Sequence, residues 1–241
     1  EENYLKAIYK LLEQAEDMVT TNAIAARMHT KAASVTDMLK KLSEKKLIHY
    51  RKYQGVTLTD SGRKVAVQII RKHRLWEVFL VKKLDFRWDE VHDMAEQLEH
   101  IDSDILIERL DDFLDNPRVD PHGDPIPDRT GKFPAADAIL LSNLIKNQSG
   151  VMTGVVDHAN TFLRYLDQIG LGLGDEIKVL EVREYDASMQ LSINKKKQIY
   201  ISYAEYCRKL KYIPSAENTF HKRLQQEIRV AGFLPRKRVH D

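Results

Sequence analysis

The sequence has little cysteine and no long apolar run. Cys207 is the only cysteine in 241 residues, which excludes a disulfide framework and a cysteine-rich zinc site and indicates a reducing, cytoplasmic setting. No stretch approaches the roughly 20 consecutive apolar residues of a membrane-spanning helix, and no secretory signal opens the chain, so we expect no membrane partner. Because the chain begins at Glu1 without a methionine, we expect a few native residues upstream.

The motifs of common enzymes are also missing. The sequence contains no His-Glu-x-x-His, no glycine-rich phosphate-binding loop and no obvious nucleophile in its loops. We therefore predict that the chain is not an enzyme and has no small organic substrate. A metal-dependent hydrolase remains a remote alternative.

Neither sign of charge is in large excess, since the net charge of the chain is +2. The charges are unevenly distributed, because residues 205–241 hold nine Lys or Arg against four Asp or Glu, and the rest of the chain is therefore acidic. This balance argues against a protein that coats nucleic acid nonspecifically, but a local basic patch is sufficient for specific DNA binding.

The first sixty residues follow the order of a winged helix-turn-helix domain. Apolar periodicity and N-cap residues Thr20, Thr21 and Asn22 predict three helices, and a Gln54-Gly55 turn predicts a hairpin. These elements are helices over 4–14, 23–28 and 34–45, and strands over 47–53 and 56–59.

In such a domain the second helix of the pair enters the major groove with its N-terminus first. The predicted DNA-binding residues are Lys31, Ala33, Ser34, Thr36 and Asp37 on this helix, and Arg51, Lys52 and Tyr53 on the wing. A winged helix that serves only as a protein-interaction module is the alternative interpretation.

Two long amphipathic helices are predicted next, over 62–84 and 88–115, and their length favours a homodimer on palindromic operator DNA. The remaining segments are predicted as an ordered loop at 117–134, a short helix or tether within a linker at 135–149, a small β-rich module at 150–202 and a basic helical tail at 203–241. The tail includes expected helices over 203–212 and 216–229.

Histidine and glutamate recur at helical spacing in this middle region. One predicted stripe on the second long helix contains His92, Glu96, Glu99 and His100, and His73 and Glu77 lie one turn apart on the first. If the two helices pack together, these nitrogen and oxygen atoms suit Mn²⁺, Fe²⁺, Co²⁺ or Zn²⁺, and the lack of a thiolate favours the harder ions. A solvated charged face is the alternative for either stripe.

These segments resemble the diphtheria toxin repressor and manganese transport regulator family. The motifs that carry the resemblance are residues 71–77 (Arg-Lys-His-Arg-Leu-Trp-Glu), 91–93, 96–100 and the proline-rich loop 120–127. The family implies a mainly α fold with small β parts. Its three domains are a winged helix-turn-helix domain (1–60), a helical metal-binding and dimerisation domain (61–134) and a C-terminal SH3-like β-barrel.

The resemblance also implies the metal ligands. Glu96, Glu99 and His100 match one family site, and His73, Glu77 and His92 match a neighbouring one. Asn3 stands where the family has a ligand on the first helix, and His158 stands where a barrel residue reaches back. Glu96 in place of a cysteine favours Mn²⁺ over Fe²⁺. Lys6 departs from manganese-responsive members, which have a glutamate there, and its ammonium cannot be a ligand and repels a cation.

The predicted function is a repressor of metal-uptake genes that binds operator DNA when metal is bound. In this hypothesis the crowded carboxylates of Glu96 and Glu99 repel each other until a divalent ion joins the helices, and the metal thereby favours the DNA-competent state. A constitutive winged-helix DNA-binding protein with a structural metal site is the alternative.

Overall fold

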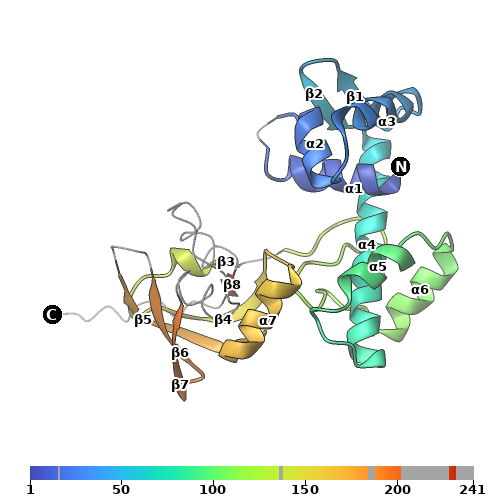
Figure 1. Cartoon of the computed structure of the whole chain (residues 1–241). Coiled ribbons are helices and arrows are strands. Elements are labelled where there is room, and N and C mark those ends of the chain that lie inside the picture. Colours follow the sequence, from blue (N-terminus) through green and yellow to red (C-terminus); the bar gives the residue numbers. More distant parts are fainter. Residues whose placement is uncertain (16, 136–137, 184–187, 202–227, 232–241) are drawn as a thin grey trace. The chain divides into compact units, whose positions relative to one another are not determined.

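The computed structural model describes residues 1–241 except 16, 136–137, 184–187, 202–227 and 232–241 (Figure 1). The chain forms two compact units. The first contains residues 1–76, 95–118 and 126–134, and the second contains residues 77–94, 119–125 and the part from 135 onward. Among the helices described here, none is long and apolar enough to cross a membrane.

The first unit begins with the predicted winged helix-turn-helix. Its elements are α1 (Glu2–Leu12), α2 (Thr21–Arg27), α3 (Ala32–Glu44), β1 (Ile48–Arg51) and β2 (Gly55–Leu58). The Thr20 side chain caps α2 by accepting a hydrogen bond from the Ala23 amide, as the run of N-cap residues predicted. The strands β1 and β2 pair antiparallel and form the wing beside α3 (Figure 1).

Apolar side chains from each of these elements meet in one core. Leu5, Ile24, Leu39 and Val56 are completely or almost completely buried in it. The following helix, α4 (Asp60–Leu84), contributes Ala66 and Ile70 to the same core. This shared core holds the start of α4 against the winged helix-turn-helix.

The prediction of one helix over 88–115 is wrong. The structure has two helices, α5 (His92–Leu98) and α6 (Asp104–Phe113). Ser103 determines where the second helix begins, because its side chain accepts a hydrogen bond from the Leu106 amide and thereby caps α6. Glu99 and His100 consequently lie in the turn after α5 rather than within a helix.

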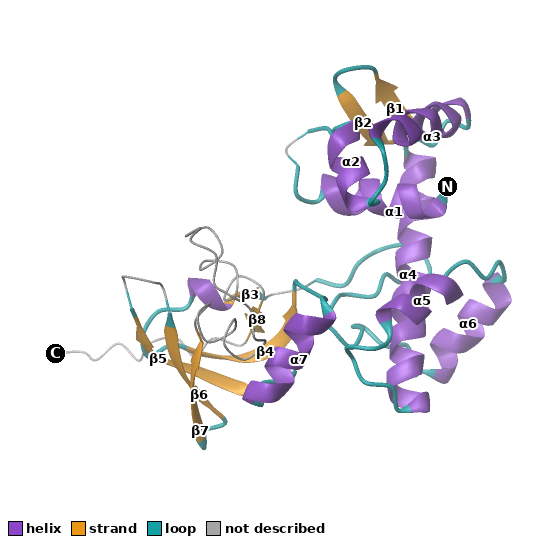
Figure 2. Ribbon diagram, in the orientation of Figure 1, coloured by secondary structure: helices purple, strands orange, loops and turns teal. Residues whose placement is uncertain are grey.

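The second unit is built on a six-stranded antiparallel sheet with the order β3-β8-β4-β5-β6-β7 (Figure 2). Its strands are β3 (Ile139–Leu140), β4 (Ser149–Val155), β5 (Glu176–Val182), β6 (Met189–Ile193), β7 (Lys197–Ile201) and β8 (Ile228–Ala231). The helix α7 (Asn160–Ile169) buries Phe162, Tyr165 and Leu166 in a core shared with the sheet. Gly170 ends α7 in a left-handed conformation, in keeping with the predicted glycine-rich turn.

Two expectations about this unit need correction. The range predicted as linker, 135–149, contains β3, the 3-10 turn η1 (Leu141–Asn143) and the first residue of β4. Leu141 and Leu144 are buried in the sheet core, which makes this segment part of the domain. The helix predicted over 216–229 is wrong at its end, because Ile228 and Val230 are buried on β8, which pairs with β4. The rest of the predicted tail lies outside the described residues.

Candidate functional site

Glu99 is the centre of the first group of predicted ligands. Its side chain is completely buried, and the Nζ atom of Lys6 lies 2.6 Å and 2.7 Å from its two carboxylate oxygens. The Nδ1 atom of His73 lies 2.6 Å from Glu99 Oε2, and because a carboxylate can only accept, the imidazole is the donor. The carboxylate therefore receives hydrogen bonds from two side chains of the same unit.

These partners determine the protonation of Glu99. Burial by itself raises the pKa of its carboxyl group, but the hydrogen bond from His73 and the charge of Lys6 outweigh burial and bring the pKa below its ordinary value. Glu99 is thus an anion with its charge already compensated. The structure contradicts the hypothesis that the charge of Glu99 is uncompensated without a metal ion.

The other members of this group lie around the same centre. Glu96 Oε1 is 3.5 Å from Lys6 Nζ, and His100 Nε2 is 3.8 Å from Glu99 Oε1. His100 Nδ1 lies 2.7 Å from Glu2 on α1. The structure therefore brings Glu96, Glu99 and His100 together, as predicted, with an ammonium group between the two carboxylates.

Asn3 lies close to this group. It lines an open hollow together with His100 and Glu2, and its amide oxygen is buried without a hydrogen-bond partner. The first helix thus offers an amide oxygen from Asn3 and a carboxylate from Glu2 beside His100.

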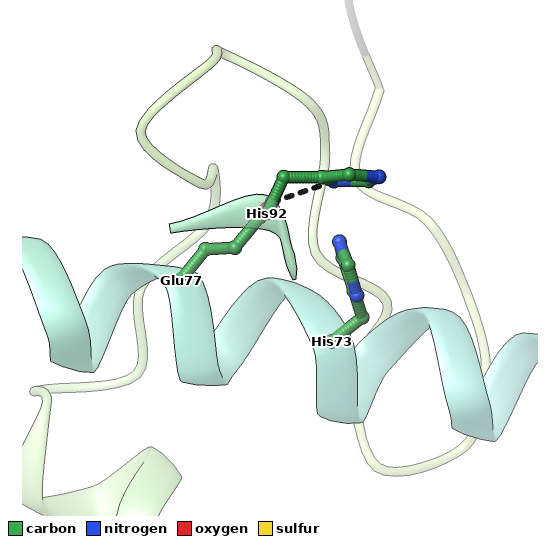
Figure 3. A group of neighbouring side chains, drawn as sticks. All are labelled: His73, Glu77 and His92. Atoms are coloured by element: carbon green, nitrogen blue, oxygen red, sulfur yellow. Dashed lines mark hydrogen bonds and ion pairs between the residues drawn. The ribbon is translucent and has the colours of Figure 1, made fainter. Parts of the chain in front are cut away.

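A second group of predicted ligands is carried by the middle of α4. His73 and Glu77 rise from α4 one turn apart, and His92 lies beside Glu77 (Figure 3). One ligand atom from each of the three lies within 4.8 Å of the others. His92 Nδ1 is 3.4 Å from Glu77 Oε1, and the Glu77 side chain is almost completely buried. The structure therefore brings these three residues together.

Glu77 also belongs to a buried group that the sequence did not predict. Asp120 and His122 come from the proline-rich loop, and their ligand atoms and that of Glu77 lie within 4.8 Å of one another. All three side chains are buried. The signal in the sequence was a histidine between two aspartates in a Pro-Gly loop, but only the fold shows that this loop returns to α4.

The hydrogen bonds of His122 define which of its nitrogens faces the carboxylate. Its Nε2 atom donates to the backbone carbonyl of Trp88 at 2.8 Å, so the neutral ring has a lone pair on Nδ1. This atom lies 3.7 Å from Glu77 Oε2. Burial lowers the pKa of His122, but hydrogen bonding to Glu77 and the charges of Glu77 and Asp120 outweigh it and raise the pKa to about 9. The site attracts a positive charge to this atom.

His158 adds a third imidazole to this part of the second unit. Its ring stacks on that of His122 with 4.5 Å between centroids, and it meets the His92 ring edge-on at 6.4 Å. His158 Nε2 lies 3.7 Å from Asp124 Oδ2. The structure therefore places His158 beside the predicted ligand His92.

This second-unit group has the chemistry of a divalent metal site. Its described members are the buried carboxylates of Glu77 and Asp120 and the imidazole of His122, and His92 lies beside Glu77. Such nitrogen and oxygen donors suit Mn²⁺, Fe²⁺, Co²⁺ or Zn²⁺. Asp120 also accepts hydrogen bonds from the amides of His122 and Asp124, at 2.8 Å and 2.9 Å, which hold the loop in shape. Hydrogen bonds of this kind orient metal ligands.

The predicted DNA-binding residues lie where a winged helix presents them. Lys31 is the N-cap of α3, and the helix starts with exposed Ala33 and Ser34. Thr36 donates its hydroxyl to the Ala32 carbonyl, and Asp37 pairs with Lys40 at 3.2 Å.

On the wing, Arg51, Lys52 and Tyr53 are exposed, and the Lys52 ammonium lies 4.9 Å from the centre of the Tyr53 ring. The wing therefore presents two cationic groups and an aromatic ring to solvent.

Comparison with known protein families identifies the three parts of the chain. Residues 1–56 match the iron dependent repressor N-terminal DNA binding domain. Residues 59–128 match the iron dependent repressor metal binding and dimerisation domain, and residues 139–208 match the FeoA domain. This order agrees with the predicted fold class.

Individual relatives and solved structures agree with this result. The iron-dependent repressor IdeR of Mycobacterium tuberculosis is 33% identical over 159 residues, which is 64% of this chain and 69% of that protein. The diphtheria toxin repressor of Corynebacterium glutamicum is 35% identical over 127 residues, covering 52% of this chain and 55% of that protein.

A solved manganese-dependent transcriptional repressor in complex with manganese has a TM-score of 0.79 and 35% identity, covering 95% of this chain and 98% of that chain. The manganese regulator SloR has a TM-score of 0.70 and 31% identity, covering 95% and 97%. With winged helix, helical domain and FeoA domain in the same order and this level of identity, the chain belongs to the iron-dependent repressor family of metal-dependent transcriptional repressors.

Proposed function

We propose that this chain binds double-stranded operator DNA as a homodimer when Mn²⁺ or Fe²⁺ is bound, and that it thereby represses metal-uptake genes in the cytoplasm. The observation that carries the proposal is the buried group of Glu77, Asp120 and His122 with His92 beside it. The iron and manganese in the names of the relatives are consistent with these donors.

The residues of this group fit a divalent ion for an electrostatic reason. Glu77 and Asp120 place two carboxylates in a region shielded from water, where anionic charge needs a counterion. His122 aims Nδ1 at Glu77 and binds a proton there in the absence of another cation. A bound metal ion supplies that positive charge instead, with Glu77, His92, Asp120 and His122 as its proposed ligands and His158 beside them.

The choice of metal follows from the donor atoms. Carboxylates and imidazoles without a thiolate favour Mn²⁺ or Fe²⁺ over softer ions, whereas Zn²⁺ and Co²⁺ are expected to bind in vitro.

DNA binding is assigned to α3 and the wing. The exposed N-terminal turn of α3, from Lys31 to Ser34, is the segment that enters the major groove in helix-turn-helix proteins. Arg51 and Lys52 on the wing supply cations for phosphate contacts.

Homodimerisation is supported by α6. Ile105 and Phe113 are eight residues apart, hence on one face of the helix, and they are 72% and 58% exposed. Large apolar side chains exposed on one face mark an interaction surface, and the symmetry of a dimer matches palindromic DNA.

Metal and DNA are then linked through one equilibrium. If metal favours the DNA-competent state, DNA must tighten metal binding by the same factor, and such couplings amount to roughly 5–150-fold.

The test uses the full chain and a DNA duplex selected from a random library in the presence of Mn²⁺. We expect fluorescence anisotropy to show binding at least about tenfold tighter with Mn²⁺ than with chelator, and this difference to disappear in Glu77→Gln and His122→Ala. His49→Gln, an exposed histidine outside the group, is the matched control for metal uptake. Equal affinity with metal and with chelator contradicts the proposal and leaves a constitutive DNA-binding protein.

A further inference from the structure

Lys6 is a charged residue in a buried part of α1. Its neighbours Leu5, Ala7 and Ile8 are buried, and the Lys6 side chain itself is only 10% exposed. A lysine usually keeps its ammonium in water, so a buried ammonium requires partners. Lys6 has them in Glu99 and Glu96.

The ammonium of Lys6 occupies the centre of the group formed by Glu96, Glu99 and His100. It donates to both oxygens of Glu99, at 2.6 Å and 2.7 Å, and lies 3.5 Å from Glu96. A cation that contacts both oxygens of one carboxylate and approaches a second does what a metal ion does between such groups. The same position cannot hold an ammonium and a divalent ion together, because both are cations and both need the same oxygens.

The surrounding residues complete a set of charge pairs without a metal ion. His73 donates to Glu99 at 2.6 Å, and Glu2 lies 2.7 Å from His100. Glu2 and Lys6 are one turn apart on α1, so this helix presents an anionic acceptor to His100 and a cationic donor to the carboxylates. Charge complementarity of this kind holds α1 against the α5 turn.

We propose that Lys6 is a built-in cation that replaces a divalent ion at Glu96, Glu99 and His100, so that these three residues form a permanent ion-pair network and metal binding depends on the group around Glu77. The inference rests on the proposed metal-dependent function. It assigns the two groups different roles, one structural and one responsive to metal.

The experiment measures bound Mn²⁺ per chain by equilibrium dialysis and elemental analysis. We expect one ion in the wild type, retained in Glu99→Gln and lost in Glu77→Gln. We expect Lys6→Glu, which adds a third carboxylate in place of the ammonium, to bind one more ion, and this additional ion to be lost when Glu99→Gln is combined with it.

Lys6→Gln is the second variant, since Lys6→Glu places three carboxylates together and can fail to fold without metal. It removes the charge but keeps a polar side chain of similar length, and circular dichroism verifies its fold. We expect it to bind an additional ion that the wild type does not bind even at Mn²⁺ concentrations about tenfold higher. An unchanged Mn²⁺ titration in folded Lys6→Gln overturns the inference.

The two proposals fail in different ways. Two ions in the wild type, one of them lost in Glu99→Gln, overturn the role of Lys6 and leave the proposed repressor function intact. No ion in the wild type but one in Lys6→Glu overturns the proposed function and supports the role of Lys6.

Discussion

The Nε atom of Arg164 on α7 lies 2.6 Å from Oδ2 of Asp89, whose side chain is almost completely buried. Arg87 donates to the other oxygen of the same carboxylate at 2.9 Å. Asp89 therefore joins the segment between α4 and α5 to the helix of the β-sheet domain, within the second unit.

This pairing predicts a pH-dependent contribution to stability. Burial raises the pKa of Asp89, but the hydrogen bonds from Arg164 and Arg87 outweigh it and lower the pKa below its ordinary value. A carboxyl group with a lower pKa in the folded state stabilises the fold above its unfolded-state pKa, near about 4, and loses this effect as the pH falls further.

We expect Arg164→Ala to lower the free energy of unfolding by about 1–3 kcal/mol at pH 7, as for a hydrogen bond to a charged group. Urea denaturation at pH 7 and below pH 4 measures this difference, which must shrink at the lower pH. Lys178→Ala, an exposed cation on β5, is the control. A loss that is equal at both pH values contradicts the assignment to Asp89.

The tight packing of Gly123 predicts that the loop with Asp120 and His122 is sensitive to a larger side chain at this position. The φ of Gly123 is +83°, and a Cβ atom there meets the Thr153 carbonyl oxygen at 2.0 Å. We expect Gly123→Ala to cost about 2–5 kcal/mol, since backbone strain and overpacking add, and to weaken Mn²⁺ binding.

Gly174→Ala is the matched control for that substitution. Gly174 has a similar φ of +88°, but no atom lies within 4 Å of the added Cβ. Only the conformational cost of about 1–2 kcal/mol is expected, with Mn²⁺ binding retained. Thermal unfolding and metal titration of both variants measure the two effects, and equal losses of stability speak against the close contact with Thr153.

The assignment of α3 and the wing to DNA predicts a salt effect. We expect Lys31→Ala and Arg51→Ala each to reduce the slope of log affinity against log salt concentration by about 0.9, because each removes one phosphate contact. Anisotropy titrations at salt concentrations from about 50 to 200 mM measure this slope. If both variants keep the wild-type slope, these side chains do not contact phosphate.

The exposed apolar face of α6 predicts the effect of acidic substitutions on assembly. We expect the double variant Ile105→Glu and Phe113→Glu to be monomeric, since it places two carboxylates at exposed apolar positions of α6 and thereby opposes association of two copies through this face. Val182→Glu, an exposed apolar residue on β5, is the control. Sedimentation velocity distinguishes the states, and a variant that remains dimeric excludes this face as the interface.

Local patterns in the sequence were sufficient for most of the helices and strands. Thr20 caps α2 because its side chain reaches an amide three residues ahead, and alternation of apolar residues produced β5 and β6 where expected. The single helix over 88–115 was mispredicted because the apolar period continues across Ser103, whose side chain caps the start of a separate helix. The strand β8 was missed since its identity depends on pairing with β4, more than seventy residues earlier.

The sequence by itself determined the winged-helix order of the first elements, the resemblance to a repressor family and the pairing of His73 with Glu77 one turn apart, because local motifs and helical spacing are properties of neighbouring residues. Only the tertiary structure decided what those residues meet. It placed Asp120 and His122 of a distant loop beside Glu77, and it placed the ammonium of Lys6 on Glu99. The electrostatic partners of a side chain depend on distance in space, and in a buried region they decide whether the charge of a carboxylate is already compensated, as it is for Glu99.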